Sequence, residues 1–245
     1  LAQGQATARL PIRTGEYLQL TQHARPEKTG EHFDEAEPFV VRTIPPHPTI
    51  APRIRSVALV HRLREVRVQF GFTRLEPASA DNQGEYDSLD VKRAPLAVDA
   101  RWLPAATVHG EGIFLELCPD ALEKWSNRPA VQARAAELAA GWEAWHEARP
   151  RHDADGKRKV PPFLGAKFYL LHSLSHLLIN TIAMDCGYSA SAIRERIYCA
   201  PYQDDSSIMA GIMFYTGTVG SEGTLGGLVE QGRRIHEHLL RAMRA

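Results

Sequence analysis

The stretch LGAKFYLLHSLSHLLINTIAMDC, residues 164–186, decides the fold of this chain. It is long enough for about six helical turns and is apolar around most of its circumference. Gly187 follows at the position where a left-handed residue commonly ends a helix. Because Lys167, His172, His176 and Asn180 interrupt the apolar run, a membrane span is not expected and a central, largely buried helix is predicted.

Further elements are predicted on both sides of this helix. Strands are expected at 193–199 and from Ala210, followed by a glycine-rich turn and a final amphipathic helix from Leu225 to Met243. Upstream, a strand is expected from Gly112, and Pro119 and Pro129 suit the first turns of two helices. In residues 56–70, apolar side chains recur at helical spacing, which favours a helix. The chain is therefore predicted to be an α/β protein with a mixed short sheet packed on the central helix and the C-terminal helix.

Proline and charge patterns divide the chain into four parts. Residues 1–55 contain an irregular, proline-rich segment and are expected to be an extended connector. Residues 56–150 are expected to form an α/β subdomain with a basic helix. Residues 151–162 contain charged residues, prolines and a glycine, and they are predicted to form a linker. Residues 163–245 are predicted to form the core of a C-terminal domain.

Composition limits the classes of function. The 245 residues carry 29 basic and 29 acidic side chains, so attraction for nucleic acid has to come from local patches. Three cysteines, Cys118, Cys186 and Cys199, are too few and too widely spaced for a disulfide framework or a CxxC zinc site. The opening residues lack the apolar core of a signal peptide. We therefore expect a cytoplasmic protein without membrane contact.

His172 and His176 lie four residues apart on the central helix and hence on one face, and Asn180 continues this polar line. Two histidines so placed can bind a metal, but Ser173 stands where a HExxH metalloprotease has its glutamate. A third ligand would have to come from elsewhere, for example Cys199 or His109. The sequence favours the alternative, in which the three side chains form hydrogen bonds across an interior seam, and no metal ligand is predicted.

A glycine-rich segment precedes the last helix. Gly220, Ser221, Gly223 and Thr224 lie between a predicted strand and a predicted helix, where backbone N–H groups can bind anions. Residues 210–245 contain no lysine, so the P-loop element GK[ST] is missing. A tight turn followed by close packing of the helix is the favoured interpretation, with weak anion binding as the alternative.

Arginine is concentrated between residues 53 and 74. This segment contains a single acidic residue, Glu65, and six arginines: Arg53, Arg55, Arg62, Arg64, Arg67 and Arg74. Arginine suits phosphate, and such a cluster can provide sequence-independent affinity for DNA. A solvated or intersubunit face paired with acidic residues, such as those at 31–37, is an equally open interpretation.

Seven short motifs form a recognisable series: RLREV from Arg62, GFTRL from Gly71, GEGIFLEL from Gly110, LHSLSHLLI from Leu171, CGYS from Cys186, RERIY from Arg194 and GSEGTLGGLV from Gly220. The series resembles the DrmB family, the helicase-associated subunits of the DISARM phage-defence system, and the resemblance covers residues 56–229. The same C-terminal domain also occurs beside superfamily-2 helicases in DNA repair.

The resemblance implies a non-catalytic accessory subunit that pairs with a superfamily-2 helicase of the DrmA type and aids its engagement of DNA. ATP would be used by the partner, and this chain would hold no cofactor of its own. Family members usually continue into a cysteine-rich tail that binds zinc, and this chain ends at Ala245. Two other functions stay open: a metal-dependent hydrolase that uses His172 and His176, and a structural adaptor without DNA contact.

Overall fold

The computed structural model describes residues 11–34, 36–69, 71–72, 92–93, 102–148, 151–152, 158–159, 163–200, 208–217 and 227–244. Its centre is a six-stranded sheet in the order β1-β2-β3-β6-β10-β9. Only β1 and β2 pair in parallel, and every other neighbouring pair of this sheet is antiparallel. The chain is therefore a mixed α/β protein, as predicted.

The strands of the sheet are β1 (Arg25–Pro26), β2 (Phe39–Ile44), β3 (Ile54–Val68), β6 (Ala105–Leu117), β9 (Arg194–Tyr198) and β10 (Gly211–Tyr215). The helices are α1 (Ile12–Thr21), α2 (Pro119–Ser126), α3 (Pro129–Ala148), α4 (Gly165–Cys186), α5 (Gly227–Arg233) and α6 (Ile235–Ala242), with a short 3-10 turn at Ala190–Ala192. Two pairs of two-residue strands lie apart from the sheet: β4 (Gly71–Phe72) with β5 (Lys92–Arg93), and β7 (Arg151–His152) with β8 (Arg158–Lys159).

The sheet has an apolar core on each of its two faces. On one face, α4, α5 and α6 pack on buried side chains that include Val57, Ile113 and Ile212. On the other face, Tyr17 and Leu20 of α1 pack on a second cluster that includes Phe114 and Tyr198. Strands covered on both faces need apolar residues in both registers, which explains the uninterrupted buried run at residues 57–60 of β3.

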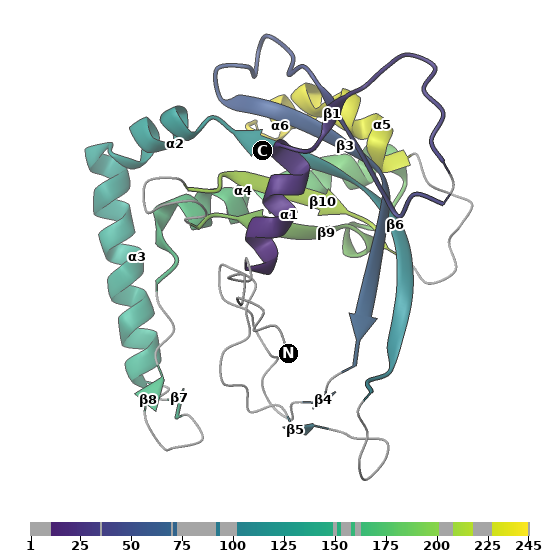
Figure 1. Ribbon diagram of the computed structural model, residues 1–245. Coiled ribbons are helices and arrows are strands. Elements are labelled where there is room, and N and C mark those ends of the chain that lie inside the picture. The colour runs from purple at the N-terminus through teal and green to yellow at the C-terminus, as the bar shows by residue number, and fades with distance from the viewer. Residues whose placement is uncertain are drawn as a thin grey trace, which may run out of the picture.

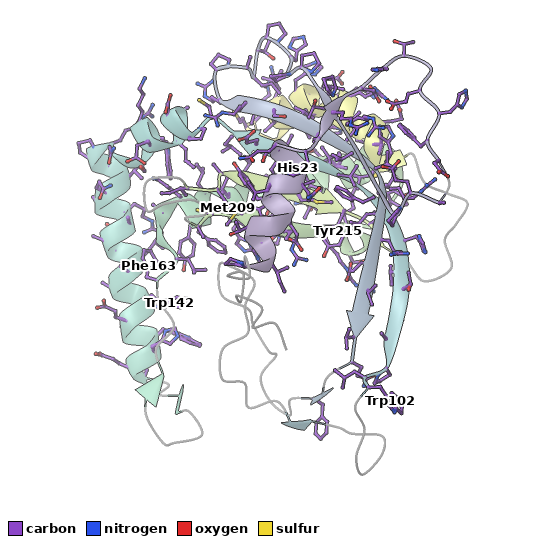
Figure 2. All side chains as sticks on the ribbon, in the orientation of Figure 1. His23, Trp102, Trp142, Phe163, Met209 and Tyr215 are labelled. Carbon is purple, nitrogen blue, oxygen red and sulfur yellow. The ribbon has the colours of Figure 1, made fainter. Side chains whose placement is uncertain are left out.

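Two projections extend from this core (Figure 1). The distal parts of β3 and β6 continue beyond the end of β10 as a two-stranded ribbon, and α3 projects in the same direction on the opposite side of the molecule. Trp102 lies near the far end of the ribbon, and Trp142 lies on α3 (Figure 2). Of the residues in α3, only His146 is fully buried, so this helix offers most of its surface to solvent.

The helix predicted for residues 56–70 is wrong, because this segment forms the long strand β3. The helical spacing of its apolar residues has two causes. Residues 57–60 are buried on both faces, and an irregularity in the pairing between Val60 and Leu63 shifts the alternation of the following residues. The basic helix of the predicted subdomain is therefore a basic strand.

The predicted division into a connector and two domains does not match the sheet. Residues 1–55 were expected to be an extended connector, but α1 covers one face of the sheet and β2 is one of its strands. Strands from both sides of the predicted linker at 151–162 belong to the same sheet, since β6 pairs with β10. Apart from β7 and β8, that linker lies outside the described residues.

Several other predictions are confirmed. Helix α4 occupies nearly the predicted range, and Gly187 ends it with a φ of 72°. Pro119 and Pro129 begin α2 and α3, and the strands predicted near residues 112, 193 and 210 are present. The final helix is divided at Arg234 into α5 and α6. Of the helices described, none has the length and apolar character needed to cross a membrane.

Candidate functional site

Two histidines of α4 and one glutamate of β9 come together where the helix lies beside the edge strand of the sheet. His172 and His176 are one helical turn apart, and their rings lie edge to face with centroids 4.6 Å apart. The Oε1 atom of Glu195 lies 2.7 Å from Nδ1 of His172 and 3.7 Å from Nε2 of His176. One donor atom from each of the three side chains lies within 4.8 Å of the other two.

Neighbouring side chains hold this cluster in place. Ser175, which is fully buried, lies with its Oγ in hydrogen-bonding contact with Oε2 of Glu195 and with the main-chain oxygen of His172. The second carboxylate oxygen, Oε1, is thereby directed at the histidines. The ring of Phe168 stacks on the imidazole of His172 with centroids 5.9 Å apart. The donor atoms are thus oriented by a buried hydroxyl group, an aromatic ring and a continuous helix.

The predicted interior seam of His172, His176 and Asn180 is wrong in its location. The side chains of the two histidines are 42% and 63% exposed, and Asn180 is also exposed. The hydrogen-bond partner expected for an imidazole does exist, because the Glu195 carboxylate contacts His172.

The sequence did not indicate Glu195, because the spacing of residues along a chain does not predict which side chain of a later strand will contact a helix. Alternation along β9 was the available signal, since Ile197 belongs to the core beneath α4 and Glu195 shares its face. Cys199 and His109, the third ligands that the sequence suggested, do not join the group among the residues that the structure describes.

The predicted arginine cluster does not form one surface. Arg53 and Arg55 are exposed at the start of β3, and Arg64 is exposed near its other end. Arg64 lies nine positions after Arg55, which corresponds to about 30 Å along a strand. Side chains alternate across a strand, so Arg64 and Arg67 point to opposite faces. Arg74 lies outside the described residues.

Some of these arginines are already bound within the chain. Arg62 donates hydrogen bonds to the main-chain oxygens of Asp34 and Glu37, so it ties the segment before β2 to β3. Arg67 donates to the Glu65 carboxylate at 2.9 Å. Arg55 contacts Glu116 at a longer distance of 3.5 Å. Of the five arginines described, Arg53, Arg55 and Arg64 therefore remain the most accessible to a ligand.

Arg64 also borders a cavity of about 520 Å³ between α1 and the sheet. Charges of both signs line this cavity, including Glu16, Glu65 and Arg196. Arg196 forms an ion pair with Glu16 at 2.8 Å. Burial raises the pKa of the Glu16 carboxyl, and this effect outweighs the opposing effect of Arg196. No sequence pattern indicated this cavity, because its walls come from α1 and four separate strands.

The four residues predicted to bind an anion, Gly220, Ser221, Gly223 and Thr224, lie outside the described residues. The start of the helix that follows them is described, and a carboxylate already occupies it. Glu111, which is fully buried, accepts hydrogen bonds from the backbone N–H groups of Leu228 and Val229 at 2.8 and 3.3 Å. These N–H groups are thus not available to an external phosphate.

Comparison with known proteins gives two matches. Residues 174–245 match the family described as MZB, the MrfA Zn-binding domain. Over 225 residues, 90% of its length, the chain is 35% identical to the DISARM protein DrmB of Bacillus paralicheniformis. That alignment covers 36% of the DrmB protein, so the chain spans about a third of its curated relative. The chain is therefore similar to the DISARM protein DrmB over most of its own length, and its residues 174–245 match the family model of the MrfA Zn-binding domain.

Proposed function

We propose that this chain is part of a bacterial anti-phage defence protein that acts in the cytoplasm as an accessory to a superfamily-2 DNA helicase. In this proposal the chain is not an enzyme, and it helps a helicase of the DrmA type to engage DNA. The observation that carries the proposal is the 35% identity to a DISARM protein over 90% of the chain.

The exposed arginines support a DNA-binding role. Arg53 and Arg55 lie two residues apart at the start of β3 and Arg64 lies about 30 Å further along the strand, so they would contact phosphates at separate points of a nucleic-acid backbone. Because the chain as a whole has no net charge, this local excess of positive charge would supply the attraction.

Two features favour a helicase partner as the site of ATP hydrolysis. The glycine-rich segment lacks the lysine of a P-loop, and residues 210–245 contain no lysine at all. At the start of α5, the carboxylate of Glu111 occupies the backbone N–H groups that could otherwise face a phosphate. In the proposal, ATP therefore belongs to the partner, and this chain holds no nucleotide.

The test is co-purification of the chain with the superfamily-2 helicase encoded beside its gene, followed by ATPase assays with and without DNA. We expect a stable complex in which the chain increases the DNA-stimulated ATPase activity of the helicase and hydrolyses no ATP alone. Absence of a complex, or ATP hydrolysis by the chain alone, would contradict the proposal. Loss of phage protection in cells that lack the protein would connect the complex to defence.

The same assays separate the two alternative functions. A structural adaptor would bind the helicase but leave the DNA affinity of the complex unchanged. A metal-dependent hydrolase would show metal-stimulated cleavage activity that His176→Ala abolishes. The cluster of His172, His176 and Glu195 is the observation that keeps this second alternative open.

A further inference from the structure

We propose that His172, His176 and Glu195 bind one divalent transition-metal ion, and that zinc is the ion that fits best. The proposal concerns metal binding by this chain and does not depend on a helicase or on DNA. It replaces the expectation from sequence that no residue here is a metal ligand. The reason for the change is Glu195, which only the tertiary structure brings to the two histidines.

The donor atoms have the right chemistry and spacing. Zinc is bound by imidazole nitrogens and carboxylate oxygens at about 2.0–2.2 Å, which separates neighbouring donors in a tetrahedral site by about 3.4 Å. The distances from Glu195 Oε1 to His172 Nδ1 and to His176 Nε2, 2.7 and 3.7 Å, lie on either side of this value. Small rotations of exposed side chains would therefore bring all three donors to bonding distance.

The surroundings of Glu195 support a site that is ready for a metal. Bound metals are usually held by ligands that neighbouring groups orient. Ser175, which is buried, contacts Oε2 of Glu195, and this leaves Oε1 for the metal. Both histidines project from a helix that is continuous from Gly165 to Cys186, and Phe168 stacks on His172. The ligands would therefore give up little conformational freedom when the ion binds.

The resemblance places the zinc of the family in a cysteine-rich tail, so the cluster proposed here is a separate site with its own ligands. The matched residues, 174–245, include His176 and Glu195, and His172 lies just before them. In the part of the chain that the structure describes, these are the three side chains that gather as ligands, and Cys186 and Cys199 do not join them. Two histidines and one glutamate make an open site, in which the remaining position is filled by water or by a ligand from a partner.

The proposal is limited to binding. A hydrolytic zinc site of the HExxH type needs a general base on the helix, and Ser173 stands at that position. The exposure of the histidines, 42% and 63%, makes the site reachable from solvent. An ion there would connect α4 to β9, the edge strand of the sheet, and would stabilise the folded state because unfolding separates the ligands.

The test uses the purified 245-residue chain, stripped with EDTA and dialysed against Zn²⁺ or Co²⁺. We expect inductively coupled plasma mass spectrometry to find about one bound ion per chain. The Co²⁺ form should show the visible absorption bands of a low-symmetry site, and the zinc form should have a higher Tm than the metal-free chain. His176→Ala and Glu195→Gln should each abolish all three signals. Ser175→Ala should weaken zinc affinity by about 10- to 100-fold, as expected when a group that orients a ligand is removed.

His23→Ala is the matched control, since this exposed histidine lies just beyond the end of α1, in a different part of the molecule (Figure 2). It should bind zinc as the unchanged chain does. His176 is itself exposed, so its removal should leave the fold intact, and circular dichroism checks this directly. The proposal fails if the unchanged chain binds no ion, or if His176→Ala and Glu195→Gln bind as much zinc as His23→Ala.

Discussion

The buried carboxylate of Glu111, on β6, accepts a hydrogen bond from the backbone N–H of Leu228 at 2.8 Å. This contact joins the middle of the sheet to the first turn of α5. The same carboxylate accepts a bond from Val229, and Tyr188 donates to it from the segment after α4. An anion-binding helix terminus is thus present in this protein, but its anion is a side chain of the same chain.

We expect Glu111→Ala to lower the free energy of unfolding by about 3 kcal/mol, because it leaves two backbone N–H groups buried without an acceptor. Glu111→Gln keeps one acceptor oxygen and should cost less. Urea denaturation followed by circular dichroism measures both values. Glu143→Ala, which changes an exposed residue of α3, should have almost no effect. Equal stabilities of Glu111→Ala and Glu143→Ala would rule out this role for Glu111.

Gly110 and Gly141 should respond in opposite directions to alanine. A Cβ atom on Gly110 would overlap the main-chain carbonyl oxygen of Thr216, and backbone cannot move aside as a flexible side chain can. We expect Gly110→Ala to cost at least about 1–3 kcal/mol. Nothing lies within 4 Å of a Cβ on Gly141, in α3, so Gly141→Ala should stabilise the chain by about 0.5–1 kcal/mol. Thermal denaturation of the two variants tests both expectations. A higher Tm for Gly110→Ala than for the unchanged chain would contradict the close contact between Gly110 and the main chain of Thr216.

If the exposed arginines in β3 and directly before it bind DNA, changing Arg53, Arg55 and Arg64 together to alanine should reduce the salt dependence of binding. Removing one arginine–phosphate interaction reduces the slope of log K against log salt by about 0.9 for double-stranded DNA. Fluorescence anisotropy at several salt concentrations measures this slope. The charge-matched control changes three exposed residues of the α2–α3 region to alanine, namely Lys124, Arg128 and Arg134. An equal change in both triple variants would mean that total charge, and not the strand, determines binding.

Cys199 should react very slowly with alkylating reagents. It is buried, and burial raises the pKa of its thiol to about 11. At pH 8 only about one thiol in a thousand is then ionised, and the thiolate is the reactive form. We expect the iodoacetamide reaction rate of Cys199, followed by mass spectrometry, to rise about tenfold per pH unit up to about pH 11. A rate at pH 8 as high as that of the less buried Cys118 would contradict this prediction.

Local sequence patterns were sufficient to predict the helices whose ends are marked by a proline or a glycine. Pro119 and Pro129 at helix starts, Gly187 at a helix end and the long apolar run of α4 were all read correctly. Each depends on backbone preferences within a few residues. Residues 56–70 were read incorrectly, because burial on both faces and the irregularity after Val60 removed the simple alternation of a strand.

The candidate metal site was only half visible in the sequence. The helical period places His172 beside His176 whatever the rest of the fold is, so these two donors could be predicted. Glu195 reaches them because β9 is the edge strand and α4 packs beside it, and that arrangement depends on the order of strands in the sheet. The arginines between residues 53 and 67 are the opposite case. They are close in sequence, but the extended strand β3 separates them in space.

By itself, the sequence determined the α/β class, the central helix and its end, the resemblance to DISARM proteins and the pair of histidines on one helical face. These features follow from short-range periodicity, from backbone preferences and from motifs. The tertiary structure alone decided that β3 is a strand, that one sheet spans the predicted linker, that Glu195 completes the histidine cluster and that Glu111 caps α5. Each of these depends on contacts between segments far apart in the chain, whose free energy comes from joint burial and hydrogen bonding that no local pattern records.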